Sequence, residues 1–284
     1  MLMDACKDHL LRWYYLATLP RRRQSSAQRK AQGQVPMQVL FYHRVADEHP
    51  NDWTISPESF ATQINWLQEQ FDIVSLQEAQ RRIECGQNEI PTVSITFDDG
   101  YADNCKTAVP YLLEREIPFT YFVTTDNTSS GEPFIHDQQT GCPLEPNSVE
   151  QLREMASAGV EIGAHTRTHA DLGKLDDEQA LYDEIVGSKR DLESLLERPV
   201  HYFAFPFGMP ENMSPLAFRI AFQAGLWGVC SAYGGYNFPG DDGFHLQRIH
   251  GDPLWGRFRN WLTIDPRKLR NSEHFELGDY RFCF

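Results

Sequence analysis

The stretch Val93-Ser-Ile-Thr-Phe-Asp-Asp-Gly-Tyr101 reads as a buried strand that ends in two adjacent acidic residues. Its alternate positions are β-forming apolar residues, and Gly100 ends the run. Because neighbouring side chains at a strand end point in different directions, one carboxylate of Asp98 and Asp99 can bind a metal while the other faces a water. Asp-Asp-Gly is also an ordinary turn sequence. The rest of the sequence is therefore needed to distinguish an ordinary turn from a metal site.

A second short strand, 160–164, leads directly into His165-Thr-Arg-Thr-His169. Two histidines four residues apart can face one way on a helical turn, and imidazole is a good ligand for Zn²⁺ and similar metals. The spacing alone also arises by chance in a chain with ten histidines. One strand that ends in Asp-Asp-Gly and another that ends in HxxxH form a much rarer combination. Two histidines and one aspartate would leave a coordination position for water.

These two motifs, Thr96-Phe-Asp-Asp-Gly100 and His165-Thr-Arg-Thr-His169, resemble the first two motifs of the polysaccharide deacetylases, the carbohydrate esterases with a NodB-homology domain. The resemblance covers roughly residues 37–269. It implies that Asp98 is the catalytic base and that Asp99, His165 and His169 hold a divalent metal, Zn²⁺ first and Co²⁺ or Mn²⁺ as alternatives. It also implies an irregular α/β barrel of seven or eight strands.

Two histidines compete for the role of proton donor to the leaving amine. His43 follows the predicted strand 37–42 and resembles the early histidine of a deacetylase subgroup in which the acid motif comes first. His250 follows the last predicted strand, 246–249, where the other relatives keep their acid histidine. We expect His43 to be the acid. The alternative is that it caps a strand end for structural reasons.

Phe203-Ala-Phe-Pro-Phe-Gly208 resembles the family's third motif but departs from it at two positions. Relatives have arginine where this chain has Ala204, and tyrosine where it has Phe207. The second change matters little, because the resemblance assigns the oxyanion to the backbone N–H of that residue. The first leaves Asp98 without its usual cation. Arg248, at the end of the last predicted strand, could supply one from elsewhere, unless it forms a surface salt bridge.

Composition limits the remaining classes of protein. With 284 residues, 41% hydrophobic and 23% charged, the chain is typical of a soluble globular protein with a sizeable core. Its net charge of −14 argues against nucleic acid as the main partner. The six cysteines are scattered without a CxxC, which favours free thiols in a reducing compartment. No transmembrane run or signal-peptide core is visible, so a cytoplasmic location is expected.

Residues 1–36 differ in charge from the remainder. They carry a net charge of +5, which leaves −19 for the other residues. The segment 10–16 predicts a short aromatic-rich helix, followed by Arg21-Arg-Arg23 and a polar tether. This helix could pack on the domain, or it could dock on an anionic membrane surface or a protein partner, peripherally.

Strands alternate with helices along the rest of the chain, which predicts a parallel, barrel-like sheet. Helices are expected at 57–71, 75–86, 104–116, 149–158, 177–197 and 215–224, and near 252. Residues 126–147 look irregular and should overhang the cleft, with His136 and Asp137 in that loop. The expected division is an extension at 1–36, a catalytic barrel at 37–270 and a tail at 271–284.

The predicted function is metal-dependent removal of N-acetyl groups from an N-acetylated amino-sugar polysaccharide or glycan. An amidase or cyclic-imide hydrolase acting on a small molecule is the alternative within enzymes, because the same fold supports it. A non-catalytic glycan-binding module is the alternative outside them. The complete set of Asp98, Asp99, His165 and His169 argues against that module, because a site that has lost its catalytic activity usually lacks at least one metal ligand.

Overall fold

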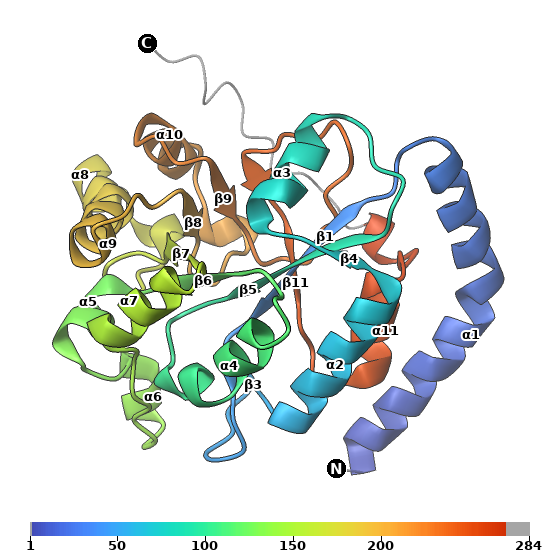
Figure 1. The fold of residues 1–284 in the computed structure, drawn as a ribbon, viewed down its shortest axis with the longest axis horizontal. Helices are drawn as coiled ribbons and strands as arrows, with labels where there is room; N and C mark the ends of the chain where they lie inside the picture. The colour runs from blue at the N-terminus through green and yellow to red at the C-terminus, as the bar shows by residue number, and fades with distance from the viewer. Residues whose placement is uncertain (1, 271–284) are drawn as a thin grey trace.

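The structure, a computed structural model, describes residues 2–270. Its centre is a mostly closed, parallel sheet in the order β10-β9-β8-β7-β6-β5-β1-β11, with β4 paired to β5 (Figure 1). The predicted irregular (β/α) barrel is thus confirmed. Its strands are β1 (Met37–Tyr42), β4 (Asp72–Ile73), β5 (Thr92–Phe97), β6 (Phe119–Val123), β7 (Glu161–Ala164), β8 (Tyr202–Ala204), β9 (Gly228–Cys230), β10 (His245–Leu246) and β11 (Arg248–His250). A separate pair joins β2 (Arg44–Val45) to β3 (Thr54–Ile55).

Helices cover the outside of the barrel. They are α1 (Leu2–Ala31), α2 (Pro57–Gln70), α3 (Leu76–Glu84), α4 (Ala108–Leu113), α5 (Thr125–Ser130), α6 (Ile135–Gln139), α7 (Val149–Ser157), α8 (Glu178–Tyr182), α9 (Ser188–Leu196), α10 (Pro215–Gln223) and α11 (Trp255–Leu262). Short 3₁₀ turns lie at Ala102–Lys106, Leu172–Lys174, Pro210–Asn212 and Lys268–Arg270. The helix starts follow from local chemistry: Ser56, Ser75, Ser148 and Ser214 each accept a hydrogen bond from the backbone N–H of the third residue of the helix that follows.

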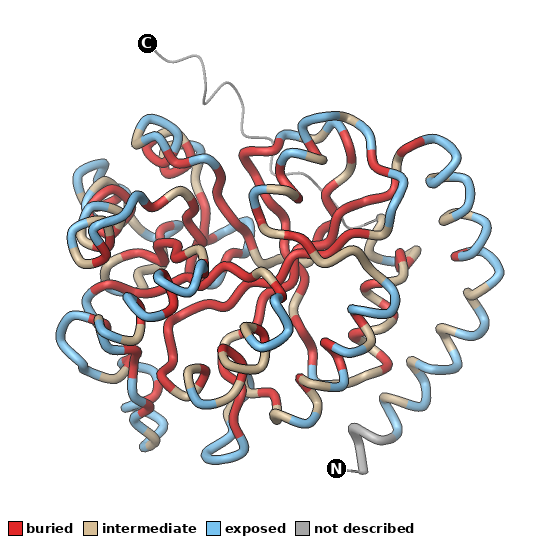
Figure 2. The backbone as a smooth tube through the Cα atoms, viewed as in Figure 1, coloured by how far each residue is buried: buried red, intermediate tan, exposed pale blue. Residues whose placement is uncertain are grey.

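The alternation of side chains along the strands separates the core from the site. In β5, Ile95 and Phe97 join the large apolar cluster beneath the surrounding helices. Thr96 and then Asp98 point to the opposite side, where Arg248 meets both of them. The buried strands form the centre of the molecule in Figure 2. One strand therefore contributes to the packing of the barrel on one face and to its chemistry on the other.

Three local expectations need correction. The predicted tether after residue 16 is helical, because α1 continues to Ala31 and packs along α11. The loop 126–147 contains α5 and α6 and is only partly irregular. The last predicted strand, 246–249, is two short strands, β10 and β11, which occupy opposite ends of the sheet order.

Two further expectations, a long helix and free thiols, are confirmed for the described residues, and a third lies outside them. The long helix at 177–197 is confirmed, although a π-helical turn at Asp183–Gly187 separates α8 from α9. Free thiols are confirmed for the cysteines that the structure describes: Cys6, Cys85, Cys105, Cys142 and Cys230. The predicted tail at 271–284 lies outside the described residues.

Candidate active site

The candidate site lies where several parallel strands end. Asp98 and Asp99 directly follow β5, and His165 directly follows β7. His43 follows β1 in the same way, since β1 pairs with β5 along its whole length up to Tyr42 and Phe97. Because parallel strands bring their carboxyl ends to one edge, residues far apart in the chain meet there.

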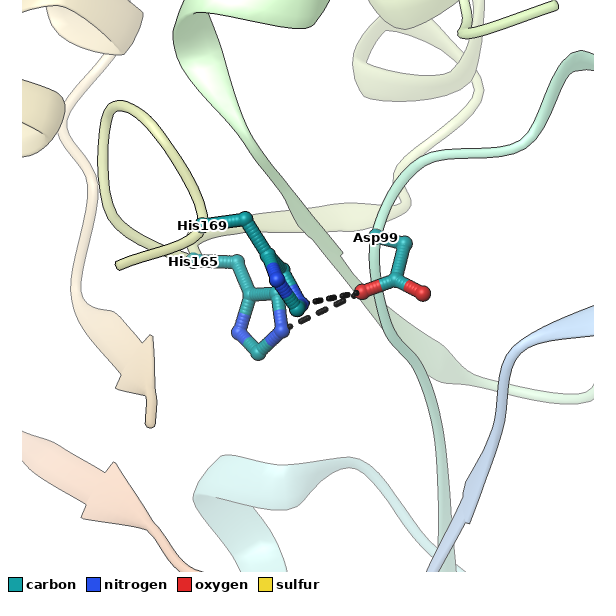
Figure 3. A group of neighbouring side chains, drawn as sticks. All are labelled: Asp99, His165 and His169. Atoms are coloured by element: carbon teal, nitrogen blue, oxygen red, sulfur yellow. Dashed lines mark ion pairs between the residues drawn. The ribbon is translucent and has the colours of Figure 1, made fainter. Parts of the chain in front are cut away.

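Asp99, His165 and His169 form one compact group (Figure 3). The Nε2 atoms of His165 and His169 lie 3.3 Å and 3.2 Å from the same carboxylate oxygen, Oδ1 of Asp99. Asp99 and His165 are buried, and the His169 side chain keeps about one seventh of its surface exposed (15%). The group is therefore open to solvent on the side of His169.

The chemistry of these atoms fits a divalent cation. Nδ1 of His165 lies 2.8 Å from the carbonyl oxygen of Ala204, so this nitrogen carries the proton and Nε2 is left as an acceptor. Oδ1 of Asp99 is buried and has no hydrogen-bond donor within the described residues. Acceptors that converge in this way require positive charge between them. The pKa of His169 shows the same preference for positive charge. Burial lowers this pKa, but the hydrogen bond and the charge of Asp99 raise it above the ordinary value.

The backbone that carries these ligands differs from the expectation. His165-Thr-Arg-Thr-His169 does not form a helical turn, because Thr166 and His169 have positive φ angles of 65° and 61°. Asp99, across the site, also has a positive φ of 71°. Such angles are uncommon for residues with a Cβ and gather at functional sites. The two rings converge through this irregular turn instead of through helical spacing.

Asp98 faces Arg248 in a two-pronged contact. Nη1 and Nη2 of Arg248 donate to Oδ1 and Oδ2 of Asp98 at 2.6 Å and 2.8 Å, and both side chains are almost completely buried. Arg248 also donates to the Ser231 carbonyl at 2.8 Å and to Oγ1 of Thr96 at 3.1 Å. Burial raises the pKa of Asp98, but the charge of Arg248, its hydrogen bonds and the neighbouring histidines together outweigh burial, so the pKa lies below the ordinary value. The carboxylate is held ionised and in one orientation.

His43 and His250 lie close together, with ring centroids 6.4 Å apart. Burial lowers the pKa of His43, against the opposing pull of Asp99 and Asp98, in that order. Burial and then the charge of His43 lower the pKa of His250 to about 4. Asp98 and Asp99 thus both act on the pKa of His43, and Asp98 also acts on that of His250. Its buried Nδ1 has no hydrogen-bond partner among the described residues.

Phe207 closes another side of the group. Its ring packs edge-on against His169 with centroids 5.2 Å apart, and its side chain is 56% exposed. Its φ is +61°, and within residues 2–270 its backbone N–H has no hydrogen-bond acceptor. The next residue must be glycine: Gly208 has φ +60°, and a Cβ there would lie 2.6 Å from the amide nitrogen of Ala232.

One further feature of the site was not apparent from the sequence, and another follows the expectation that the loop 126–147 overhangs it. Trp53, which is 48% exposed, packs against His43 with centroids 4.7 Å apart. No motif marks it, because it lies in a short connection between β2 and β3. The loop residue His136 lies beside His169, with centroids 5.7 Å apart. Tyr101, just after the Asp-Asp pair, donates to Oδ2 of Asp137 at 2.9 Å and so holds this loop over the site.

The comparisons with known proteins agree with this geometry. The model of the family described as polysaccharide deacetylase matches residues 86–226, which include both motifs. Residues 86–226 belong to the polysaccharide deacetylase family. This family membership makes the protein a hydrolase of the carbohydrate-esterase type, and the family suggests N-deacetylation of a glycan.

Individual relatives of this polysaccharide deacetylase are distant. The protein YxkH of Bacillus subtilis (strain 168), whose name places it in the same family, is 26% identical over 207 residues, 71% of this chain and 68% of its own. The chitooligosaccharide deacetylase of Bradyrhizobium sp. (strain ANU 289) is 27% identical over 123 residues, 43% of this chain and 44% of its own. The solved structure of IcaB from Ammonifex degensii has a TM-score of 0.65 and 26% identity, covering 80% of this chain and 97% of its own.

Proposed function

We propose that the protein hydrolyses the N-acetyl amide of an N-acetylated amino-sugar polymer or glycan, with a divalent cation held by Asp99, His165 and His169. The observation that carries the proposal is the position of this ligand group next to Asp98, a buried carboxylate fixed by Arg248. Amide hydrolysis needs an activated water, a partner for the oxyanion and an acid for the leaving amine. When bound, the cation supplies Lewis acidity, which lowers the pKa of water and polarises the acetyl carbonyl.

The chain's own groups account for the proton transfers. Asp98 takes the proton of the attacking water, because Arg248 keeps it ionised and aims both of its oxygens. The unpaired N–H of Phe207 donates to the oxyanion that forms on the acetyl group. His43 gives a proton to the departing nitrogen, and its lowered pKa makes its protonated form a stronger acid than an ordinary histidine.

The surroundings favour a sugar substrate. Two half-exposed aromatic side chains flank the site, Phe207 against His169 and Trp53 against His43. Aromatic faces suit the apolar faces of sugar rings, while their edges leave the hydroxyl groups to solvent. The similarity to a protein named chitooligosaccharide deacetylase supports oligomers of N-acetylglucosamine as the first substrates to test.

The test is acetate release by the purified full chain from a panel of N-acetylglucosamine oligomers and acetylated amino sugars, each with added Zn²⁺, Co²⁺ or Mn²⁺. We expect release that depends on metal and that is lost in Asp98→Asn. Turnover of small amides or cyclic imides without acetate release from any sugar would overturn the proposal in favour of an amidase. Glycan binding without turnover under every metal would overturn it in favour of a binding module.

A further inference from the structure

Helix α1 has an inner face that ties it to the barrel. The Tyr14 hydroxyl donates to Oδ1 of Asp265 at 2.6 Å. Arg22 is 3% exposed and donates from Nη2 to Oδ1 of Asn260 at 2.7 Å. At the other end of the contact, Oδ1 of Asp8 accepts from the backbone N–H of Gly256 at 2.7 Å. The inner face of the helix therefore packs on the folded domain, which is one of the two alternatives that the sequence leaves open for residues 1–36.

Its outer face carries apolar side chains that nothing in the structure covers. Leu10, Trp13 and Leu16 are 65%, 71% and 56% exposed, among the most exposed large apolar residues described. They are three residues apart, so on an α-helix they project within one broad sector, with Trp13 at its centre. Figures 1 and 2 show this helix along the edge of the molecule, largely exposed along its length. We call Leu10, Trp13 and Leu16 the outer strip.

The charges around the outer strip are of one sign. The exposed residues of α1 include Lys7, Arg12, Arg21, Arg23 and Lys30. By helical spacing, Lys7 and Arg21 lie on one side of the strip, and Arg12, Arg23 and Lys30 lie on the other. No acidic side chain is exposed on the helix between residues 6 and 31; Asp8 is half-buried and pairs with Arg12 at 2.8 Å. An apolar strip between two rows of cations is typical of helices that lie in the plane of a membrane surface.

We propose that the outer strip of α1 docks this protein on an anionic lipid surface, with the helix axis parallel to that surface. Leucine and tryptophan would enter the headgroup region, and the flanking cations would contact acidic headgroups. The net charge of −19 outside residues 1–36 repels such a surface, so electrostatics favours approach by this face. A second copy of the chain is a poorer occupant, because a two-fold contact would bring the same cations together. Among the described helices none is long and apolar enough to cross a membrane, and the proposal does not require one.

The docking face lies toward the catalytic end of the barrel. Helix α1 ends near the start of β1, so its first half lies toward the end of β1 where His43 stands. The bond from Gly256 to Asp8 places this half at the start of α11, which follows the carboxyl end of β11. Docking through the outer strip would therefore hold the site near the lipid surface without covering it. Because α1 is already folded and packed, docking requires no ordering of the helix.

The experiment is co-sedimentation of the full chain with vesicles of phosphatidylcholine alone or of phosphatidylcholine mixed with phosphatidylglycerol. We expect binding to the anionic vesicles, weakened by salt. The triple variant Leu10→Ser, Trp13→Ser, Leu16→Ser should bind about tenfold more weakly or worse. Arg21→Gln with Arg23→Gln should lose about fivefold for each cation removed. The matched control, Ile90→Ser with Lys106→Gln, removes an exposed apolar residue and an exposed cation elsewhere and should bind like the parent.

Thermal unfolding of each variant separates docking from folding, because all of the substituted residues on α1 are exposed and should leave the Tm unchanged. The proposal is overturned if the parent sediments equally with and without anionic lipid, or if the triple variant binds as well as the parent. A dimer in light scattering that the triple variant abolishes would also overturn it, by assigning the strip to a contact between two copies. None of these readouts depends on the enzymatic activity.

Discussion

Asp98 is buried beside a guanidinium that comes from 150 residues further along the chain. The family's usual arginine position holds Ala204, whose carbonyl orients His165 instead. Arg248 reaches the same carboxylate from β11, because β1 lies between β5 and β11 and brings their ends together. The position of this buried cation is thus decided by sheet order and not by its place in a motif.

Replacing Arg248 tests whether it keeps Asp98 ionised. Without the guanidinium, burial dominates and the pKa of Asp98 rises. A base must be ionised to act, so Arg248→Met should move the acidic limb of the pH–rate profile for acetate release to higher pH. A loss of rate that is equal at every pH would contradict this role. Since breaking a buried pair costs about 3–5 kcal/mol of folding free energy, the Tm must be measured beside it.

His43 and His250 can be separated by the leaving group. General acid catalysis contributes roughly 10²–10⁴ in rate, so His43→Ala should lose about that much in acetate release while it keeps its metal. The loss should shrink for an activated aryl acetate, whose leaving group needs no proton. His250→Ala, the neighbouring control, should lose far less. Equal losses for the two substrates would remove His43 from the role of acid.

At the scale of elements, the turn His165–His169 depends on the helix that packs beneath it. Oε2 of Glu184 accepts from the backbone N–H groups of Arg167 and Thr168 at 2.9 Å and 3.1 Å. Glu184 stands in the π-helical turn between α8 and α9. Such turns often occur at functional sites, because they shift side chains out of the regular helical positions. Here the shift supplies acceptors to a turn whose backbone has positive φ angles.

Glu184 should therefore act on the metal through its ligands. Glu184→Ala leaves Asp99, His165 and His169 in place but frees the turn, and the affinity for Zn²⁺ should fall about 10–100-fold. Titration with a competing chelator measures that affinity directly. Glu178→Ala, an exposed position in α8, is the matched control and should leave the affinity unchanged. If both variants bind Zn²⁺ like the parent, the turn does not need this support.

The sequence was most informative where a local pattern fixes a strand end or a helix start. Residues 93–101 predicted β5 and the two carboxylates at its end, and Ser75 predicted the start of α3. Local patterns did not foresee that His165–His169 is an irregular turn, because its geometry depends on the distant Glu184. They also missed Trp53 beside His43, since this contact exists only after β2 and β3 have paired.

At the scale of the whole molecule, α1 joins the beginning of the chain to the last described helix. Arg22 makes the central contact, because it is buried and bonded to both the side chain and the backbone of Asn260. Arg22→Met should lower the free energy of unfolding by about 3 kcal/mol, because it leaves the buried Oδ1 of Asn260 without its donor and leaves Asp265 with only the exposed Arg267, at 3.9 Å, as a nearby cation. Arg23→Met, one exposed residue further on, should change it by about 0.5 kcal/mol or less. Denaturant unfolding that gives equal values for both variants would mean that α1 does not stabilise the barrel.

The division of work between the two adjacent carboxylates is the centre of the account, and metal content measures it most directly. The parent, Asp98→Asn and Asp99→Ala should be loaded with Zn²⁺, desalted and assayed for bound metal and for acetate release. We predict that Asp98→Asn keeps its metal and loses turnover, whereas Asp99→Ala loses both, because only Asp99 faces the two histidines. Loss of the metal from Asp98→Asn, or full retention by Asp99→Ala, would contradict the account.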